Sequence, residues 1–157
     1  MIELRKIDHD NWENVIKLEV SQDQKSFVAS NIYSLAECYV DLTEGSPPIP
    51  YAIYNGDELV GFAMANYDEV DDDDEDSDHV YHICRLMIDK KHQNKGFGKA
   101  SMIKMIELFK TFPLGKAVAI TTSYEPTNEH ARGLYKSLGF VETGDMLDDE
   151  IIAALEI

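Results

Sequence analysis

The chain has 157 residues, which is enough for one domain with its own hydrophobic core. Hydrophobic residues make up 44% of it, which excludes an intrinsically disordered protein, and the net charge of −16 disfavours nucleic acid and anionic membranes as partners. No apolar run approaches the roughly 20 residues of a membrane-spanning helix, and no apolar segment of a secretion signal follows the charged N-terminus.

The first third of the chain predicts one strand and two helices. Alternating apolar and polar residues indicate a strand over residues 2–7. Apolar residues at helical spacing then predict a helix over residues 8–20, capped by Asp8 or Asp10, and a second helix over residues 26–45 that ends at Gly45. The expected inward positions are Trp12, Val15, Ile16 and Leu18 in the first helix, and Phe27, Ile32, Leu35 and Tyr39 in the second.

The middle of the chain predicts a hairpin, a central strand and a helix. Two apolar runs over residues 51–67, joined at Asn55–Gly56, are typical of a β-hairpin. In residues 79–89, apolar residues occur at both odd and even positions, so both faces of the expected strand are apolar. This predicts a strand that is covered on both faces. An amphipathic helix is expected over residues 99–112. Its expected inward positions are Met102, Ile103, Ile106 and Phe109.

The last third predicts a buried strand, a helix and two further strands. The strand is expected over residues 116–124, and the helix over residues 127–140, capped by Thr127 or Asn128 and ended by Gly139. Residues 140–147 and 149–157 are expected to be strands, although residues 153–156 have helical propensity as well. The whole order of elements predicts a single α+β, mixed α/β, domain over residues 1–157.

A glycine turn, QNKGFGK, joins the central strand to the amphipathic helix. Gly96 and Gly98 can adopt backbone angles closed to other residues and leave no side chain in the way. Backbone NH groups at a helix N-terminus favour negative charge, and lysines at 90, 91, 95 and 99 reverse the local sign, so a pyrophosphate would suit this turn. A lysine-rich surface loop that keeps the chain soluble is the alternative. The third glycine of a Rossmann fingerprint and the Gly-Lys-Ser/Thr of a P-loop are absent.

Two motifs together resemble those of the GNAT N-acetyltransferases. A strand, then Gln93-x-x-Gly96-x-Gly98, then an amphipathic helix is similar to that family's acetyl-CoA motif. The segment TNEHARGLYKSLGF is similar to its second CoA-side element, with Asn128, Ala131, Tyr135, Gly139 and Phe140 on the pattern. The order of elements is also the family's, so the resemblance covers essentially the whole chain. It implies a GNAT fold with a mostly antiparallel sheet of about seven strands flanked by four helices.

The second motif predicts a proton donor. Asn128 and Tyr135 are seven residues apart, close to two helical turns, so they share a face with Ala131 between them. The resemblance implies that this helix flanks the pantetheine and that the tyrosine reaches the thioester sulfur. A phenol with a pKa of about 10 can protonate a leaving thiolate there. We therefore expect Tyr135 to be the general acid, and packing beside Leu134 and Leu138 is the alternative role.

The resemblance also implies acetyl-CoA as cosubstrate, with no metal. The backbone of Leu86, Met87 and Ile88 would pair with the pantetheine, and an NH near Met87 or Ile88 would face the oxyanion. Asn128 and Ala131 would complete the cofactor side. The turn NH groups expected to hold the pyrophosphate belong to Gln93, Asn94, Lys95, Gly96, Phe97, Gly98 and Lys99.

The general base is not evident from the sequence. Some family members carry a glutamate on the central strand, at a position that falls near Cys84 here, and no carboxylate stands nearby. His82 has a suitable ordinary pKa, but a lone histidine on a strand is more often structural. Cys84 lacks an evident His/Asn partner for a nucleophile, and both cysteines, Cys38 included, are expected to be buried thiols in a reducing cytoplasm. Water, Glu19 and Glu37 remain alternatives, so Glu19, Glu37 and His82 are the expected substrate-side residues.

The acidic run from Asp68 to Asp78 holds nine carboxylates in eleven residues, and the chain would carry a net charge of −7 without them. Such a field attracts a polycation, and spaced carboxylates can hold the ammonium groups of spermidine or spermine. A solvated loop is the alternative for residues 71–78. A calcium loop is a third reading, but the glycine and the position-twelve glutamate of an EF-hand are missing.

The overall pattern VSQDQKSFVASNIYSLAE, residues 20–37, followed by RLMIDKKHQNKGFGKA, residues 85–100, is also similar to that of the bacterial spermine/spermidine acetyltransferases within that family. The expected function is therefore a cytoplasmic transfer of acetyl from acetyl-CoA to a primary amine of a small cationic substrate, with no nucleic acid or membrane as partner. The alternatives are another acceptor, namely an aminoglycoside, a small metabolite or a protein N-terminus, and a non-catalytic CoA-binding module. Because family members are often dimers, the resemblance also allows a homodimer.

Overall fold

The computed structural model describes residues 1–45, 48–70 and 78–157. Within them, seven strands form one sheet in the order β1-β2-β3-β4-β5-β7-β6, and only the β4–β5 pairing is parallel. In chain order the elements are β1 (Ile2–Lys6), α1 (Trp12–Val15), the 3-10 helix η1 (Gln22–Gln24), α2 (Asn31–Glu44), β2 (Pro48–Asn55), β3 (Glu58–Glu69), β4 (His79–Ile88), α3 (Phe97–Phe109), β5 (Ala119–Tyr124), α4 (Glu129–Ser137), β6 (Val141–Leu147) and β7 (Glu150–Glu156). The expected fold class, mixed α/β with a mostly antiparallel sheet, is confirmed.

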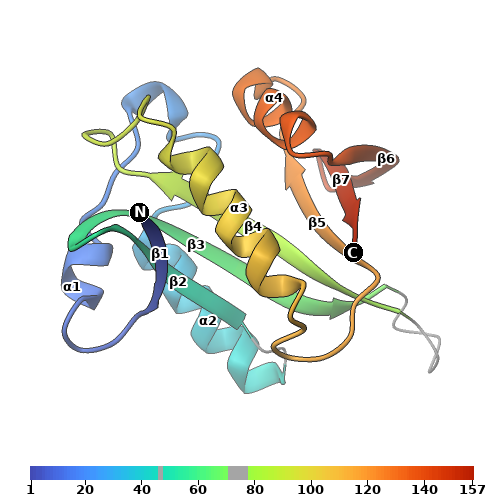
Figure 1. Ribbon diagram of the computed structural model, residues 1–157, viewed down its shortest axis with the longest axis horizontal. Coiled ribbons are helices and arrows are strands. Elements are labelled where there is room, and N and C mark those ends of the chain that lie inside the picture. Colours follow the sequence, from blue (N-terminus) through green and yellow to red (C-terminus); the bar gives the residue numbers. More distant parts are fainter. Residues whose placement is uncertain (46–47, 71–77) are drawn as a thin grey trace.

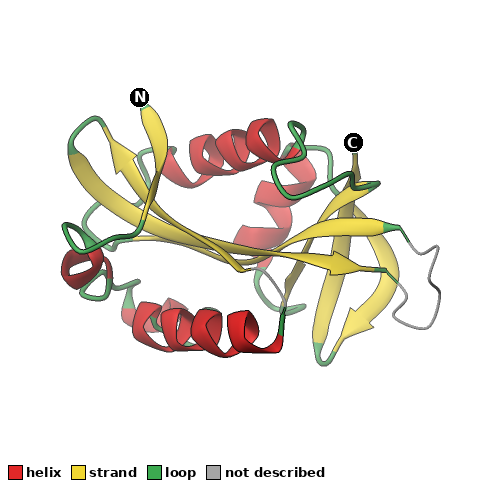
Figure 2. Ribbon diagram, turned by 90° about the horizontal axis from the view of Figure 1, so that it is seen from below, coloured by secondary structure: helices red, strands yellow, loops and turns green. Residues whose placement is uncertain are grey.

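The sheet is the middle layer of the molecule, with helices on both faces (Figure 2). On one face, Met102, Met105 and Phe109 of α3 and Tyr135 of α4 pack into a buried cluster with Tyr81 and other sheet residues. On the other face, a second cluster joins α1 and α2 to β2, β3 and β4. Among the described residues, no helix is both long and apolar enough to cross a membrane.

The two halves of the sheet are joined by a short seam. β4 pairs with β5 at four positions, from Val80↔Ala119 to Ile83↔Thr122. Beyond Ile83, β4 continues to Ile88 beside β3 alone, while β5 continues to Tyr124 beside β7. Figure 1 shows the two strands separating toward their carboxyl ends. We call this gap in the pairing, bordered by residues 84–88 of β4 and 123–124 of β5, the β4–β5 opening.

The first expected helix is much shorter than its apolar spacing predicts. Residues 8–20 were expected to be helical, but α1 is a single turn whose N-cap is Asn11, and Trp12 is 41% exposed. The physical reason is tertiary. The Glu19 NH donates to the Asp89 carboxylate at 3.0 Å, and the Glu19 carbonyl accepts from the Lys90 NH at 2.7 Å. These bonds tie Glu19 to the end of β4, so its NH and carbonyl groups are not available to continue the helix.

The second helix turns a different face inward from the one expected. α2 begins after Ser30, whose side chain accepts a hydrogen bond from the Tyr33 NH at 3.2 Å, so Phe27 lies outside it. Ile32 and Tyr39 were expected to be buried, but they are 59% and 70% exposed. The buried positions are Asn31, Ser34 and Cys38. Two polar side chains, those of Asn31 and Ser34, therefore face the sheet together with Cys38 and the partly buried Leu35.

Smaller differences concern α3, the hairpin turn and the C-terminus. Ile103 is 40% exposed, and Met105 occupies the inward position instead. Asn55 pairs with Glu58, so the two-residue loop is Gly56–Asp57 rather than Asn55–Gly56. The helical alternative for residues 153–156 is wrong, because β7 lies between β5 and β6 and its backbone bonds to both.

Candidate active site

A bulge at Cys84 shapes the β4 side of the β4–β5 opening. Ile83 pairs with Ala65 and Arg85 with Met64, so Cys84 has no partner on β3. An extra residue of this kind kinks a strand and re-aims the side chains that follow it. Here Cys84 and Arg85 both lie on the α2 side, while Leu86 packs against the α3 cluster. The bulge therefore stands where β4 leaves β5.

The turn after β4 is held by partly buried polar contacts. The Gln93 side-chain amide donates to the Ile88 carbonyl at 3.0 Å and to the Gln24 side-chain oxygen at 2.7 Å. Asp89 is 6% exposed, and its carboxylate accepts from the backbone NH groups of Glu19 and Lys91. The Gln93 side chain thus fixes the turn, and any cofactor contact at this position would come from its backbone. Sequence reasoning missed Asp89.

The turn leaves a run of donors unused. Within the described residues, no backbone NH from Gln93 to Lys99 donates a hydrogen bond, and the first bonded NH is that of Ala100. Asn94 and Gly96 have positive φ angles of 61° and 78°, which turn the chain into α3. A Cβ added at Gly98 would meet only Ile88, at 3.8 Å, so nothing in the described chain requires glycine there. The lysines at 90, 91, 95 and 99 are exposed.

The expected general acid is buried beside the seam. Asn128 caps α4, as expected, by accepting the Ala131 NH at 3.2 Å. Tyr135, 8% exposed, packs its ring at 5.5 Å from Tyr124 and 5.7 Å from Phe140. Burial raises the pKa of the Tyr135 phenol, while Thr122 acts in the opposite direction. A raised pKa keeps the phenol protonated, which is the form a proton donor needs.

The three expected substrate-side residues lie at separate places. Glu19 forms an exposed ion pair with Lys90 at 3.0 Å, and that hydrogen bond lowers the pKa of its carboxyl. The Glu37 carboxylate accepts from Arg85 at 2.9 Å. The His82 ring contacts the Thr121 hydroxyl at 2.9 Å, and burial lowers the pKa of its imidazole. Both carboxylates are therefore already matched with a cation.

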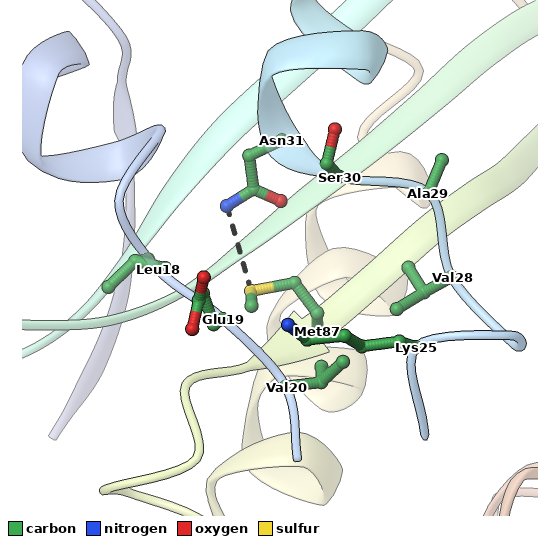
Figure 3. Close-up of a pocket in the computed structure, with 9 residues that line it drawn as sticks. All are labelled: Leu18, Glu19, Val20, Lys25, Val28, Ala29, Ser30, Asn31 and Met87. Atoms are coloured by element: carbon green, nitrogen blue, oxygen red, sulfur yellow. Dashed lines mark hydrogen bonds between the residues drawn. The ribbon is translucent and has the colours of Figure 1, made fainter. Parts of the chain in front are cut away.

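A pocket of ≈ 200 Å³ lies between the α1–α2 segment and β4 (Figure 3). Met87 forms one wall, and the buried Asn31 amide donates to the Met87 sulfur at 3.8 Å and to the Val15 carbonyl at 2.8 Å. Glu19 and Lys25 supply its charged groups, and Lys25 also lowers the pKa of Glu19. The inward Asn31 thus fastens α2 to β4 beside the pocket.

Neither cysteine is suited to act as a nucleophile. Cys38 and Cys84 are free, and burial raises their pKa values to about 11 and about 12, which leaves neither as a thiolate near neutral pH. Among the described residues, no three His, Cys, Asp or Glu side chains gather as a metal site. Residues 71–77 of the acidic run that was expected to hold a polycation, with calcium as an alternative, lie outside the described residues.

Comparison with known proteins places this geometry in context. A family model described as the acetyltransferase (GNAT) family matches residues 6–140. The chain is 32% identical over 145 residues, 92% of its length and 91% of the relative's, to a probable spermine N(1)-acetyltransferase of Bacillus subtilis subsp. natto (strain BEST195). Identity over the same coverage is 31% to the spermine/spermidine N(1)-acetyltransferase of Bacillus subtilis (strain 168). Among solved structures, aminoglycoside acetyltransferase AAC(6')-Ib in complex with coenzyme A and kanamycin matches 99% of this chain and 95% of its own, with a TM-score of 0.77 and 19% identity.

Proposed function

The chain belongs to the acetyltransferase (GNAT) family, and from this premise we propose that it transfers acetyl from acetyl-CoA to a primary amine of a polyamine such as spermidine or spermine. Identity of 31–32% over 92% of the chain to two proteins named for spermine acetylation is the observation that carries the substrate class. The net charge of −16 supports a polycationic acceptor. The same proposal places the enzyme in the cytoplasm.

The cofactor would lie along the β4–β5 opening. The unpaired edge of β4 at residues 86–88 offers backbone groups to the pantetheine, as a neighbouring strand would. The seven unused NH groups from Gln93 to Lys99 offer donors to the pyrophosphate at the N-terminus of α3. A glycine at 98 that the chain itself does not require is consistent with a ligand lying against the backbone there.

Direct attack needs one group that protonates the leaving thiolate. The buried Tyr135 phenol supports this role because it lies beside Thr122, the last β5 residue that pairs with β4. An NH of Met87 or Ile88 would stabilise the oxyanion. Acceptors would enter from the pocket between Met87 and the α1–α2 segment, on the other face of the sheet.

A panel of amines tests the proposed function. We expect the enzyme to release free thiol from acetyl-CoA in the presence of spermidine and spermine, and a mass spectrum of the product to show one added acetyl group. Kanamycin, a lysine-containing peptide and a peptide with a free N-terminus serve as the other arms. Turnover confined to one of those arms would contradict the polyamine acceptor, and no turnover in any arm would contradict catalysis itself.

A second experiment tests the general acid. The Tyr135→Phe variant should lower kcat by about 10²-fold or more, the usual contribution of a positioned proton donor. Binding of acetyl-CoA, measured by calorimetry, should change little. Tyr67→Phe is the matched control, because its hydroxyl donates to the Lys116 carbonyl before β5 and not to a residue that borders the opening. Equal kcat values for Tyr135→Phe and the control would exclude the role.

A further inference from the structure

The structure leaves the attacking amine without an evident base at the expected positions. β4 carries no carboxylate between His79 and Ile88. Glu19 is engaged with Lys90, and Glu37 with Arg85. A carboxylate already paired with a protein cation is a poor receiver for a substrate ammonium, because binding must first break that pair. A suitable group would instead be a carboxylate near the opening without a cation of its own.

Glu150 meets this description. It is the first residue of β7, half-buried, and one of its carboxylate oxygens accepts a hydrogen bond from the Ser123 hydroxyl of β5. Within the described residues it forms no ion pair, and its second carboxylate oxygen has no hydrogen-bond partner. Ser123 is one residue beyond Thr122, where β5 leaves β4, so the carboxylate is held at the edge of the β4–β5 opening.

The charge of Glu150 acts on two titratable groups near the opening, one on each face of the sheet. It raises the pKa of His82 on β4 against the effect of burial, and it also raises the pKa of Tyr135 on α4. Arg85 of β4 acts on His82 in the opposite sense from Glu150, and Asp149, exposed, precedes Glu150 in the β6–β7 turn. The carboxylate therefore lies within electrostatic range of the expected acid and of the central strand.

Glu150 and Tyr135 approach the opening from opposite faces of the sheet. Tyr135 packs in the α3 and α4 cluster together with Ile120 and Tyr124 of β5. Because side chains alternate along a strand, Thr121 and Ser123 project from the other face, where Ser123 contacts Glu150 and Thr121 contacts His82. An acceptor arriving on the Glu150 face would thus meet the thioester opposite the donor that protonates its sulfur.

The same face holds a second sign of a missing partner. Asn66 of β3 pairs directly with His82 of β4, so their side chains lie side by side. The Asn66 side-chain oxygen is buried and has no hydrogen-bond partner among the described residues. Buried acceptors are nearly always satisfied in native proteins, so this oxygen lacks a donor, and a substrate N–H group could reach it only if the Asn66 side chain turned outward.

We propose that Glu150 binds the reacting ammonium of the acceptor and removes its proton, which makes it the general base of the proposed acetyl transfer. The inference rests on the proposed function and adds the residue that the sequence did not reveal. The ammonium gives one proton to Glu150 and becomes a neutral amine, whose nitrogen forms the bond to the thioester carbon. As the C–S bond breaks, the Tyr135 phenol gives its proton to the sulfur. The second N–H proton restores the Tyr135 hydroxyl, and Glu150 releases its proton to solvent.

The test compares Glu150→Gln with Asp149→Asn, which removes the same charge from the adjacent exposed position. Glu150→Gln should lower kcat/KM for spermidine by about 10²-fold or more, with acetyl-CoA affinity and thermal midpoint close to those of the control. The loss relative to the wild-type enzyme should shrink as pH rises from about 7 to about 9, because the fraction of neutral amine then increases without a base. Glu150→Asp should retain part of the activity.

The outcomes separate this inference from the proposed function. If the wild-type enzyme acetylates none of the amines, the proposed function fails. The variants are then compared by their binding of spermidine alone. Glu150→Gln should still weaken that binding more than Asp149→Asn does. If the wild-type enzyme is active and both variants have equal kcat/KM values, Glu150 is not the base. A loss for Glu150→Gln that is the same at every pH would also overturn the assignment.

Discussion

At the scale of single residues, His82 shows how burial fixes a protonation state. Its imidazole contacts the Thr121 hydroxyl at 2.9 Å, and burial, aided by Arg85, lowers its pKa below the ordinary value. The folded protein therefore holds His82 in its neutral form at neutral pH. A neutral imidazole on the Glu150 face does not compete with a substrate ammonium for the carboxylate.

This state predicts a pH dependence of stability. The pKa of His82 is lower in the folded than in the unfolded chain. The stabilisation of the folded state by neutral His82 is therefore fully present above the unfolded pKa of about 6.5 and is lost as pH falls below it. The unfolding free energy, measured with urea, should drop between about pH 7 and pH 5, by at most about 1.4 kcal/mol per pH unit from one proton. His82→Gln should flatten this drop.

The control is His130→Gln, which removes an exposed histidine on α4. It should keep the wild-type slope. If His82→Gln and His130→Gln give the same slope as the wild-type protein, burial of His82 does not contribute to acid sensitivity in this range.

At the scale of elements, short helices depend on their caps. α4 has nine residues, and Asn128 satisfies one of its free NH groups by accepting from Ala131. α2 begins in the same way, with the Ser30 hydroxyl accepting from Tyr33. Both caps stabilise helices, but only α4 presents Tyr135 to the β4–β5 opening. The two caps thus differ in what their loss would do to the site.

Asn128→Ala and Ser30→Ala should each lower the unfolding free energy by about 1 kcal/mol. Asn128→Ala should in addition weaken acetyl-CoA binding, because the start of α4 would fray beside the expected pantetheine site. Ser30→Ala should leave that affinity unchanged, since Ser30 borders the pocket near Met87 rather than the α4 side. Urea unfolding and calorimetric titration measure the two quantities. Equal acetyl-CoA affinities for both variants would remove Asn128 from the cofactor side.

Elements also show what the sequence could and could not reveal. Strands and α3 follow local periodicity and turn residues, so their order and the glycine turn were predictable from the sequence. The early end of α1 was not predictable, because it depends on hydrogen bonds from Glu19 to Asp89 and Lys90, about 70 residues away in the chain. Nor was the inward Asn31, which contacts Met87. Glu150 stood beside no motif, and only the pairing of β5 with β7 brings it to Ser123.

At the scale of the whole molecule, charge is the dominant surface property. The net charge of −16 on 157 residues creates an attractive field for cations, while exposed lysines gather at the turn before α3. The overall negative charge suits a cationic acceptor, and the positive charge at the turn before α3 suits the cofactor phosphates. A polyamine would be attracted by the molecule as a whole, and the cofactor phosphates by one short segment.

This separation predicts a salt dependence that differs with substrate charge. The KM for spermine should rise with ionic strength, because the screening length falls from about 30 Å at 0.01 M to about 8 Å at 0.15 M salt. The KM for a singly charged amine such as butylamine should rise less. Initial-rate measurements at fixed saturating acetyl-CoA give both values. A spermine KM that is independent of salt would contradict the role of the acidic surface in substrate capture.

The short seam between β4 and β5 predicts that the two halves of the sheet differ in their stability against local unfolding. The described strands β4 and β5 pair at four positions, supported by side-chain contacts between Thr122 and Ile83 and between Thr121 and His82. Amide hydrogen exchange should therefore be faster in β5, β6 and β7 than in β3, which is paired on both sides between Gly61 and Asn66. A cofactor seated in the opening would touch both halves. Its binding should slow exchange most in the β5–β7–β6 half, because acetyl-CoA would bridge β4 and β5 where the two strands are not paired.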